Sequence, residues 1–142
     1  MSAQTSAERT RTTGHFTYAD WQERALGEED TFPRLAHAAV TNTFAGGIEA
    51  ARTTCEYTVL YLTEQTGGFT GMELLAGTVD GRRGTFAVEE RGSFDEGGSV
   101  RCAFEVVPGS ATGELAGLRG TGEFTAEQGS PSVPYTFDYD FG

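Results

Sequence analysis

Short stretches of alternating apolar and polar residues recur along this chain, and clusters of glycine, proline and aspartate separate them. Alternation with a period of two is typical of antiparallel β-strands that bury one face, and no long stretch shows the three-and-four spacing of a helix. The pattern therefore predicts an all-β fold, a single closed antiparallel eight-stranded β-barrel. The strands are expected at residues 14–21, 35–44, 48–62, 69–79, 85–94, 100–107, 121–127 and 134–141.

The segments outside these strands define the domain. Residues 1–12 are rich in Ser, Thr and Arg and are expected to be disordered, which leaves 13–142 as one barrel domain. The charged stretch 22–34 is expected to be a long connection, of the kind that often covers a barrel mouth. Because the chain has neither the apolar run of a signal peptide nor a stretch long enough to span a membrane, we expect a cytoplasmic protein.

Alternation within each strand assigns the inner face. In the last strand Tyr135 shares one side with three further aromatic residues, while Asp138 lies on the other, so the aromatic side should face the interior. Strand 69–79 can be phased either way, because both of its faces are partly apolar. The residues expected to bind a substrate are Tyr18, Trp21, Phe69, Met72, Phe86, Val88, Phe104, Tyr135, Phe137 and Tyr139.

Two acidic residues fall on faces that are otherwise apolar. Glu90 shares a face with Phe86 and Val88, and Glu73 points inward if Phe69 does. Buried carboxyls without a partner are costly and have raised pKa values, so the candidate catalytic residues are Glu73, Glu90 and Tyr57, whose hydroxyl could orient a polar group of a ligand.

Two structural alternatives stay open for these residues. A misassigned strand face would place one of the acids outside, and an ion pair with Arg52, Arg82 or Arg101 would satisfy it. Tyrosines with satisfied hydroxyls are also common in protein cores.

Composition excludes several classes of function. The chain has 10 basic residues, all of them arginine, against 21 acidic ones, and a net charge of −11. Nucleic acids and anionic membranes are therefore not expected as partners. The absence of lysine from the sequence excludes a Schiff-base or P-loop lysine.

The remaining chemically versatile residues show no recognisable pattern. Cys55 and Cys102 lack metal-site spacing and are expected to be small core residues, reduced and without a disulfide. His15 and His37 stand alone. We therefore expect neither a metal nor a cofactor.

The stretch Val107–Gly120, which begins Val-Pro-Gly-Ser, and the closing run Tyr-Thr-Phe-Asp-Tyr-Asp at 135–140 resemble the bacterial family known as domain of unknown function 3224. Further similarity at 14–21, 40–46 and 69–73 extends the resemblance over residues 14–141. The resemblance implies a barrel similar to the allene oxide cyclases, whose lumen holds an apolar substrate and directs its ring closure without a cofactor. Some actinobacterial natural-product cyclases are also small barrels of this kind.

These observations lead to two functional hypotheses. The first is a cofactor-free cyclase or isomerase, including the case of a pericyclase that catalyses a cycloaddition, acting on an apolar polyketide-like substrate. The second is a non-catalytic, lipocalin-like barrel that binds a hydrophobic metabolite. A filled barrel that acts through its surface is a third reading. We also expect a homodimer, because Met72, Leu74 and Ala76 would form an apolar patch on the outside.

Overall fold

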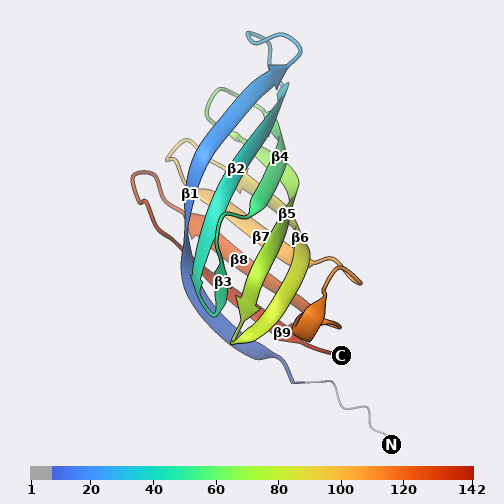
Figure 1. Ribbon diagram of the computed structural model, residues 1–142. Coiled ribbons are helices and arrows are strands. Elements are labelled where there is room, and N and C mark those ends of the chain that lie inside the picture. Colours follow the sequence, from blue (N-terminus) through green and yellow to red (C-terminus); the bar gives the residue numbers. More distant parts are fainter. Residues whose placement is uncertain (1–7) are drawn as a thin grey trace, which may run out of the picture.

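A computed structural model describes residues 8–142 as one closed antiparallel β-barrel (Figure 1). β1 pairs with both β2 and β9, and β5 pairs with both β4 and β6, so the sheet closes on itself. β3 and β4 follow one another between β2 and β5, so nine strands fill eight positions around the barrel. The strands are β1 (Thr10–Leu26), β2 (Arg34–Gly46), β3 (Ile48–Ala50), β4 (Thr54–Tyr61), β5 (Gly67–Val79), β6 (Arg82–Phe94), β7 (Val100–Val106), β8 (Arg119–Ala126) and β9 (Val133–Asp140).

Tight turns connect most neighbouring strands, as the glycine and aspartate signals predict. Gly46 has a φ of 104° between β2 and β3, and Asp80 and Gly81 have φ values of 45° and 89° between β5 and β6. Residues with positive φ match the twist of a two-residue hairpin, and glycine adopts them without steric cost. Within the described residues no helix is long and apolar enough to cross a membrane.

The barrel closes between β1 and β9, and this seam begins earlier than the sequence pattern predicts. Thr10 and Thr12 pair with Tyr139 and Phe137, so the expected disorder of residues 1–12 is wrong for the part of that segment that lies in β1. Residues 1–7 lie outside the described residues. The alternating threonines and arginines of this stretch form a strand because β9 supplies a complementary edge, which no local pattern shows.

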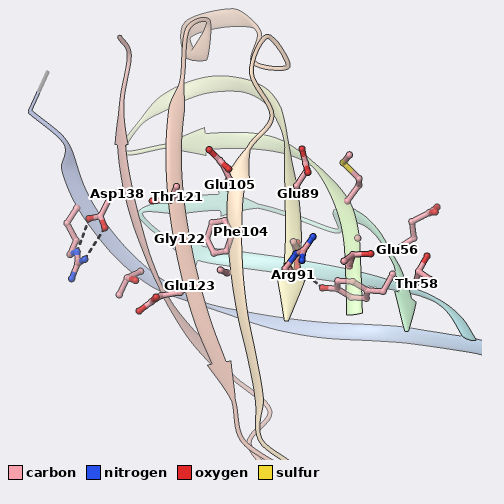
Figure 2. A pocket seen from close by; sticks show the side chains of 18 residues that line it. Glu56, Thr58, Glu89, Arg91, Phe104, Glu105, Thr121, Gly122, Glu123 and Asp138 are labelled. Carbon is pink, nitrogen blue, oxygen red and sulfur yellow. Dashed lines mark hydrogen bonds and ion pairs between the residues drawn. The ribbon is translucent and has the colours of Figure 1, made fainter. Parts of the chain in front are cut away.

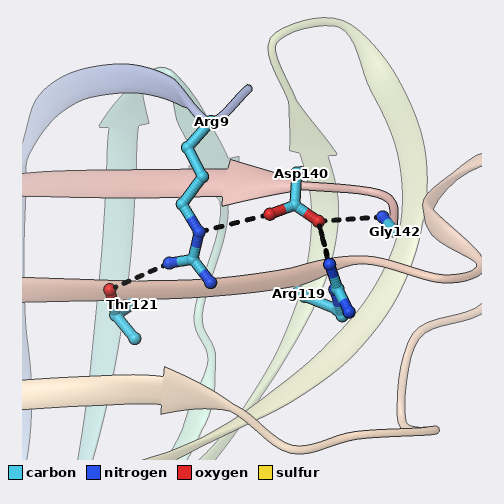
Figure 3. Close-up of polar contacts among 5 residues, drawn as sticks. All are labelled: Arg9, Arg119, Thr121, Asp140 and Gly142. Atoms are coloured by element: carbon cyan, nitrogen blue, oxygen red, sulfur yellow. Dashed lines mark hydrogen bonds and ion pairs between the residues drawn. The ribbon is translucent and has the colours of Figure 1, made fainter. Parts of the chain in front are cut away.

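Ion pairs across the outside of this seam hold the first residues in place. Arg11 Nε and Nη2 donate to the two carboxylate oxygens of Asp138 at 2.8 and 2.9 Å. Figure 3 shows Asp140 between Arg9, whose Nε donates at 3.2 Å, and Arg119, whose Nη2 donates at 3.0 Å. The Gly142 N–H and Arg119 keep the pKa of Asp140 below its ordinary value. These contacts join β1, β8 and β9 at the C-terminal end of β9.

β1 also extends further than predicted. It continues through Leu26, which pairs with Leu35, so the connection to β2 covers only residues 27–33 and the expected long loop over 22–34 is wrong. The register shifts between Ala19 and Gln22, and Asp20 has a φ of 60°. A bulge of this kind redirects the side chain beside it, and it places Trp21 at the mouth of the barrel.

The predicted strand 48–62 is divided into β3 and β4. Arg52 has a φ of 52° at the break, and its N–H donates to Thr43 Oγ1 at 3.2 Å. The break changes the alternation by one residue, so that Thr53 points into the barrel with 5% of its surface exposed. β3 therefore belongs to the closed end of the barrel and β4 to the open end.

The interior consists of two apolar layers with a polar layer between them. The larger cluster includes Phe86, Phe137 and Leu115, and the last of these comes from the 3-10 turn Gly113–Leu115 that covers the closed end. The smaller cluster lies toward the mouth and includes Tyr57 and Val59. Four buried polar side chains lie between the two clusters, one each from β2, the residue before β4, β5 and β6.

Gly71 should be essential for packing in the middle of the barrel. A Cβ at this position would overlap the carbonyl oxygen of Glu56 and come within 2.5 Å of Tyr57 Cδ1. We expect Gly71→Ala to lower the free energy of unfolding by roughly 1–3 kcal/mol, because backbone on one side cannot give way. Urea unfolding monitored by tryptophan fluorescence measures this change.

Gly68→Ala is the matched control on the same strand, since the nearest atom to its Cβ would be Gly92 O at 3.2 Å. Equal stability of Gly71→Ala and the unmodified protein would contradict the close approach of Tyr57 to this backbone.

Candidate functional site

The polar layer between the two apolar clusters is the first component of the site. Asn42 comes from β2, Thr53 directly precedes β4, Glu73 comes from β5 and Glu90 from β6. Their exposed fractions are 3%, 5%, 2% and 4%. Both glutamates therefore face inward, and a misassigned strand face is excluded for each. Alternation predicts this direction for Glu90, whereas for Glu73 it left both directions open.

Glu73 is held by two neutral donors. Its Oε2 accepts hydrogen bonds from Asn42 Nδ2 at 2.9 Å and from Thr53 Oγ1 at 2.5 Å. Thr53 Oγ1 in turn accepts the Asn42 N–H at 3.2 Å, so the two donors position one another. Neutral donors can stabilise a buried carboxylate without an ion pair.

Glu90 is reached by a tyrosine from two strands away. Tyr57 and Glu90 both pair with Gly71, which lies between them on β5 and has no side chain. The Tyr57 hydroxyl crosses this gap and donates to Glu90 Oε1 at 2.8 Å, and Cys102 Sγ approaches the same oxygen at 3.7 Å. The arrangement explains why residue 71 must be glycine.

The contact between the two acids determines the charge of the site. Burial raises the pKa of Glu90 well above its ordinary value, and the hydrogen bond and negative charge of Glu73 raise it further, whereas Tyr57 and Cys102 lower it in part. Among the described residues no ion pair joins either acid to Arg52, Arg82 or Arg101, so this alternative is wrong: Arg52 lies 3.6 Å from Asp20, and Arg82 packs over Phe141. Carboxylate oxygens of the two acids lie within 4.8 Å of one another, and two negative charges so close without a cation are unfavourable, so Glu90 is the protonated member.

The two cysteines belong to the same layer and are not activated. Both are free and buried. Burial, followed by the nearby glutamates, raises the pKa of each thiol above its ordinary value, so neither is a thiolate nucleophile. This agrees with their expected role as small core residues.

The polar layer also contains the one group of potential metal ligands within residues 8–142. Cys55 Sγ and a carboxylate oxygen of each glutamate lie within 4.8 Å of one another. A thiolate with two carboxylates could hold Zn²⁺ after loss of the thiol and carboxyl protons. Asn42, Thr53 and Tyr57 already satisfy the carboxyls as donors, so a shared proton accounts for the arrangement without a metal ion.

A cavity of about 580 Å³ opens above this layer at the mouth of the barrel. Its walls are mostly aromatic and aliphatic, and Tyr57 and Asn42 belong to its lining. The two residues that hold the buried acids are thus also surfaces that a ligand would touch. The apolar side chains of the lining are Phe16, Tyr18, Trp21, Val40, Val59, Tyr61, Phe69, Phe94, Val100, Phe124, Ala126 and Val133.

Glu23 on β1 positions two rings of this lining. Its Oε1 accepts a hydrogen bond from Trp21 Nε1 at 3.1 Å, and its Oε2 accepts one from the Tyr61 hydroxyl at 2.5 Å. Partial burial and this carboxylate raise the pKa of Tyr61 to about 12. The Trp21 ring lies 6.3 Å from that of Tyr57, which in turn meets Phe69 edge-on at 5.0 Å.

A second hollow of about 780 Å³ lies on the outside of the barrel, across β4 to β9 and the start of β1 (Figure 2). Figure 2 shows charged side chains along it, among them Glu89, Arg91, Glu105 and Asp138. They are the outward members of the alternating strands. Tyr57, Gly71 and Glu90 also belong to the lining of this hollow. We consider the mouth cavity the better candidate site, because its walls are mostly apolar.

The structure divides the predicted substrate-binding residues into three groups. Tyr18, Trp21 and Phe69 line the mouth cavity together with Tyr57, and Trp21 and Tyr18 are about half exposed there. Met72 is 51% exposed on the outside of β5, so its prediction as a lumen residue is wrong. The third group lies in the core of the closed end, away from the cavity: Phe86, Val88, Phe104, Tyr135, Phe137 and Tyr139.

Sequence reasoning missed several residues of the site. Asn42 lies on an apolar face of β2, and this buried-polar signal was present in the sequence. Thr53 could not be found, because its inward orientation depends on the break at Arg52. Phe94 lies at a strand end, where the position of the cavity decides whether a side chain packs in the core or lines the opening.

The free energy of unfolding should decrease as the pH rises, because Glu90 then becomes ionised inside the barrel. Because its pKa is raised in the folded protein, ionisation there is opposed, and stability is lost as pH rises from the ordinary glutamate pKa to the raised value. The loss is about 1.4 kcal/mol for each pH unit between the two values. We expect Glu90→Gln to remove this slope in urea unfolding between about pH 5 and pH 8.

Glu89→Gln is the control, since Glu89 is the exposed neighbour on the same strand and its variant should follow the unmodified protein. A flat stability profile of the unmodified protein over that range, or a stoichiometric metal ion in the purified protein, would contradict a protonated Glu90.

Comparisons with known proteins agree with the fold and identify the family. No curated protein matches this chain. The crystal structure of a protein with unknown function from the DUF3224 family of Shewanella oneidensis MR-1 is similar, with a TM-score of 0.73 and 30% sequence identity over 95% of this chain and 99% of that chain. The family model described as protein of unknown function (DUF3224) matches residues 12–139. The chain therefore belongs to the DUF3224 family, as the resemblance of its sequence motifs predicts.

Proposed function

We propose that this protein is a cofactor-free cyclase or isomerase that acts on a flexible, apolar small molecule held in the mouth cavity. The observation that carries the proposal is the contact between an apolar cavity and a buried acid. Tyr57 lines the cavity, and its hydroxyl donates a hydrogen bond to Glu90. The carboxyl of Glu90 is kept protonated by burial and by Glu73.

The size and walls of the cavity support binding of such a molecule. About 580 Å³ is within the range of small-molecule sites, which are usually apolar with a few polar groups. The ring of Tyr57 lies between those of Trp21 and Phe69 in a chain of neighbouring aromatic pairs, which restricts the shape of a ligand packed against them. Confinement of a flexible polyene in a reactive conformation can remove several kcal/mol of an entropic barrier.

Tyr57 is the polar group proposed to act on the substrate. Burial and the neighbouring Glu90 raise the pKa of its hydroxyl, so it stays a neutral donor. On turning from Glu90 to a carbonyl oxygen of the substrate, this hydroxyl would stabilise negative charge that develops there during ring closure. Glu90 and Asn42 would then position Tyr57 and the substrate without forming a covalent bond.

One observation favours a second function, non-catalytic binding of a hydrophobic metabolite. Neither Glu73 nor Glu90 lines the mouth cavity, because Asn42 and Tyr57 lie between these acids and the opening. An acid without access to a ligand cannot protonate it directly. In this reading the polar layer serves to hold the barrel together, and Tyr57 only shapes the floor of the cavity.

Incubation with a linear polyene that carries a conjugated diene and an activated alkene separates the two functions. The cyclase is expected to form a cyclic isomer of unchanged mass faster than buffer does, and Tyr57→Phe should slow it roughly tenfold to a hundredfold. Chromatography with mass spectrometry measures the product. Tyr139→Phe is the matched control, because it removes a tyrosine–carboxylate bond to Asp80 outside the mouth cavity.

Recovery of the bound polyene unchanged after long incubation would overturn the cyclase and support the binding protein. A rate that Tyr57→Phe leaves unaltered would overturn the role of the hydroxyl, with cavity shape as the remaining source of any acceleration.

Location and assembly are further parts of the proposal. Cys55 and Cys102 are free and buried, which fits a reducing compartment such as the cytoplasm. Met72 and Leu74 are 51% and 61% exposed on the outside of β5, which supports a homodimer through this face. Sedimentation of the purified protein tests the dimer.

A further inference from the structure

We infer that the ligand of the mouth cavity is an apolar molecule with an amine or ammonium group at the end that faces the opening. The inference rests on the proposed function only in using the mouth cavity as the binding site. It adds a prediction of the charge of the ligand, which follows from the carboxylates of the rim and the aromatic rings of the walls.

The rim of the cavity is negatively charged. Glu64 comes from the β4–β5 connection, Asp95 and Glu96 from the β6–β7 connection, and Glu127 from the β8–β9 connection, and all four line the opening. No arginine or histidine lines the cavity within residues 8–142. A carboxylate or phosphate at the open end of a ligand would therefore meet four like charges without a counterion.

Two of these carboxylates remain available to a ligand. Asp95 Oδ1 accepts the N–H groups of Gly97 and Ser99 at 3.0 and 3.2 Å, so it stabilises its own turn. Glu127 Oε2 accepts the Ser99 hydroxyl at 2.7 Å. Within the described part of the chain Glu64 and Glu96 have no hydrogen-bond or ion-pair partner. They are exposed at two different edges of the same opening.

Aromatic rings beside the rim supply the second component of an ammonium site. Tyr18 and Trp21 line the cavity while 53% and 50% exposed, which is unusual for rings of this size. Glu23 fixes the indole of Trp21 through its Nε1. The face of an indole attracts a cation, and a nearby carboxylate reinforces that attraction.

One basic side chain, Arg34, lies near the cavity but is not part of its lining. The guanidinium of Arg34 packs 4.8 Å from the centre of the Tyr61 ring and 5.1 Å from that of Phe32. Tyr61 lines the cavity, but Arg34 does not. The charge that a ligand meets at the opening is thus set by the four carboxylates, and Glu23 beside Trp21 adds to them.

Three probes with one apolar body and different head groups test the inference. They are 4-phenylbutylamine, 4-phenylbutan-1-ol and 4-phenylbutyrate, each used to displace the neutral dye N-phenyl-1-naphthylamine from the full-length protein. The amine is expected to bind about fivefold more tightly than the alcohol, and the acid more weakly than the alcohol. Added salt should reduce the preference for the amine, because the rim carboxylates are exposed.

A matched pair of double variants separates the rim from the overall charge of the protein. Glu64→Gln with Glu96→Gln should abolish most of the preference for the amine. Glu105→Gln with Glu123→Gln changes the net charge equally but lies in the outer groove, and it should preserve the preference. Circular dichroism confirms that both variants are folded.

The outcomes distinguish this inference from the proposed function. Tight binding of the alcohol with no preference for the amine would overturn the inference and leave the apolar cavity as a binding site. Equal loss of preference in both double variants would overturn the role of the rim and assign the effect to net charge. Failure of the neutral dye and the alcohol to bind would overturn the proposed function itself.

Discussion

Two carboxyls face the inside of a closed barrel, and the rest of the site depends on how their charge is accommodated. Glu73 and Glu90 lie on paired strands with 2% and 4% of their surfaces exposed, among described residues that offer them no cation. Neutral donors and a shared proton are therefore required, since an uncompensated buried charge would cost more than the fold can supply. Asn42, Thr53 and Tyr57 meet that requirement as hydrogen-bond donors. For Thr53 and Tyr57, an irregularity of the backbone makes the contact possible.

The same requirement links the interior to the mouth. Tyr57 reaches Glu90 only because Gly71 lies between them, and Thr53 reaches Glu73 only because the strand breaks at Arg52. Tyr57 and Asn42 donate hydrogen bonds to the two acids, and the remaining surfaces of these side chains form part of the floor of an apolar cavity. The polar layer inside the barrel and the floor of the cavity therefore depend on the same few side chains.

The mouth is built differently from the closed end. At the closed end, Phe137 and Leu115 are fully buried and leave no room for a ligand. At the mouth, the ring of Trp21 is half exposed, and a hydrogen bond to Glu23 holds it in place where no core side chains surround it. Carboxylates from three strand connections surround these rings, which gives the opening a charge opposite to that of an amine.

Alternation in the sequence by itself determined the fold class, the hairpins and the inward direction of Glu90 and Tyr57, because a period of two assigns every second residue of a regular strand to the same face. It could not place Met72, since β5 has apolar residues on both faces, or Thr53, whose direction follows from an irregular backbone. Only the closed tertiary structure decided which inward aromatics are core and which line the cavity. Whether a ring such as Phe86 or Phe69 meets another side chain or open space depends on what the opposite wall of the barrel supplies, and residues far apart in the chain form that wall.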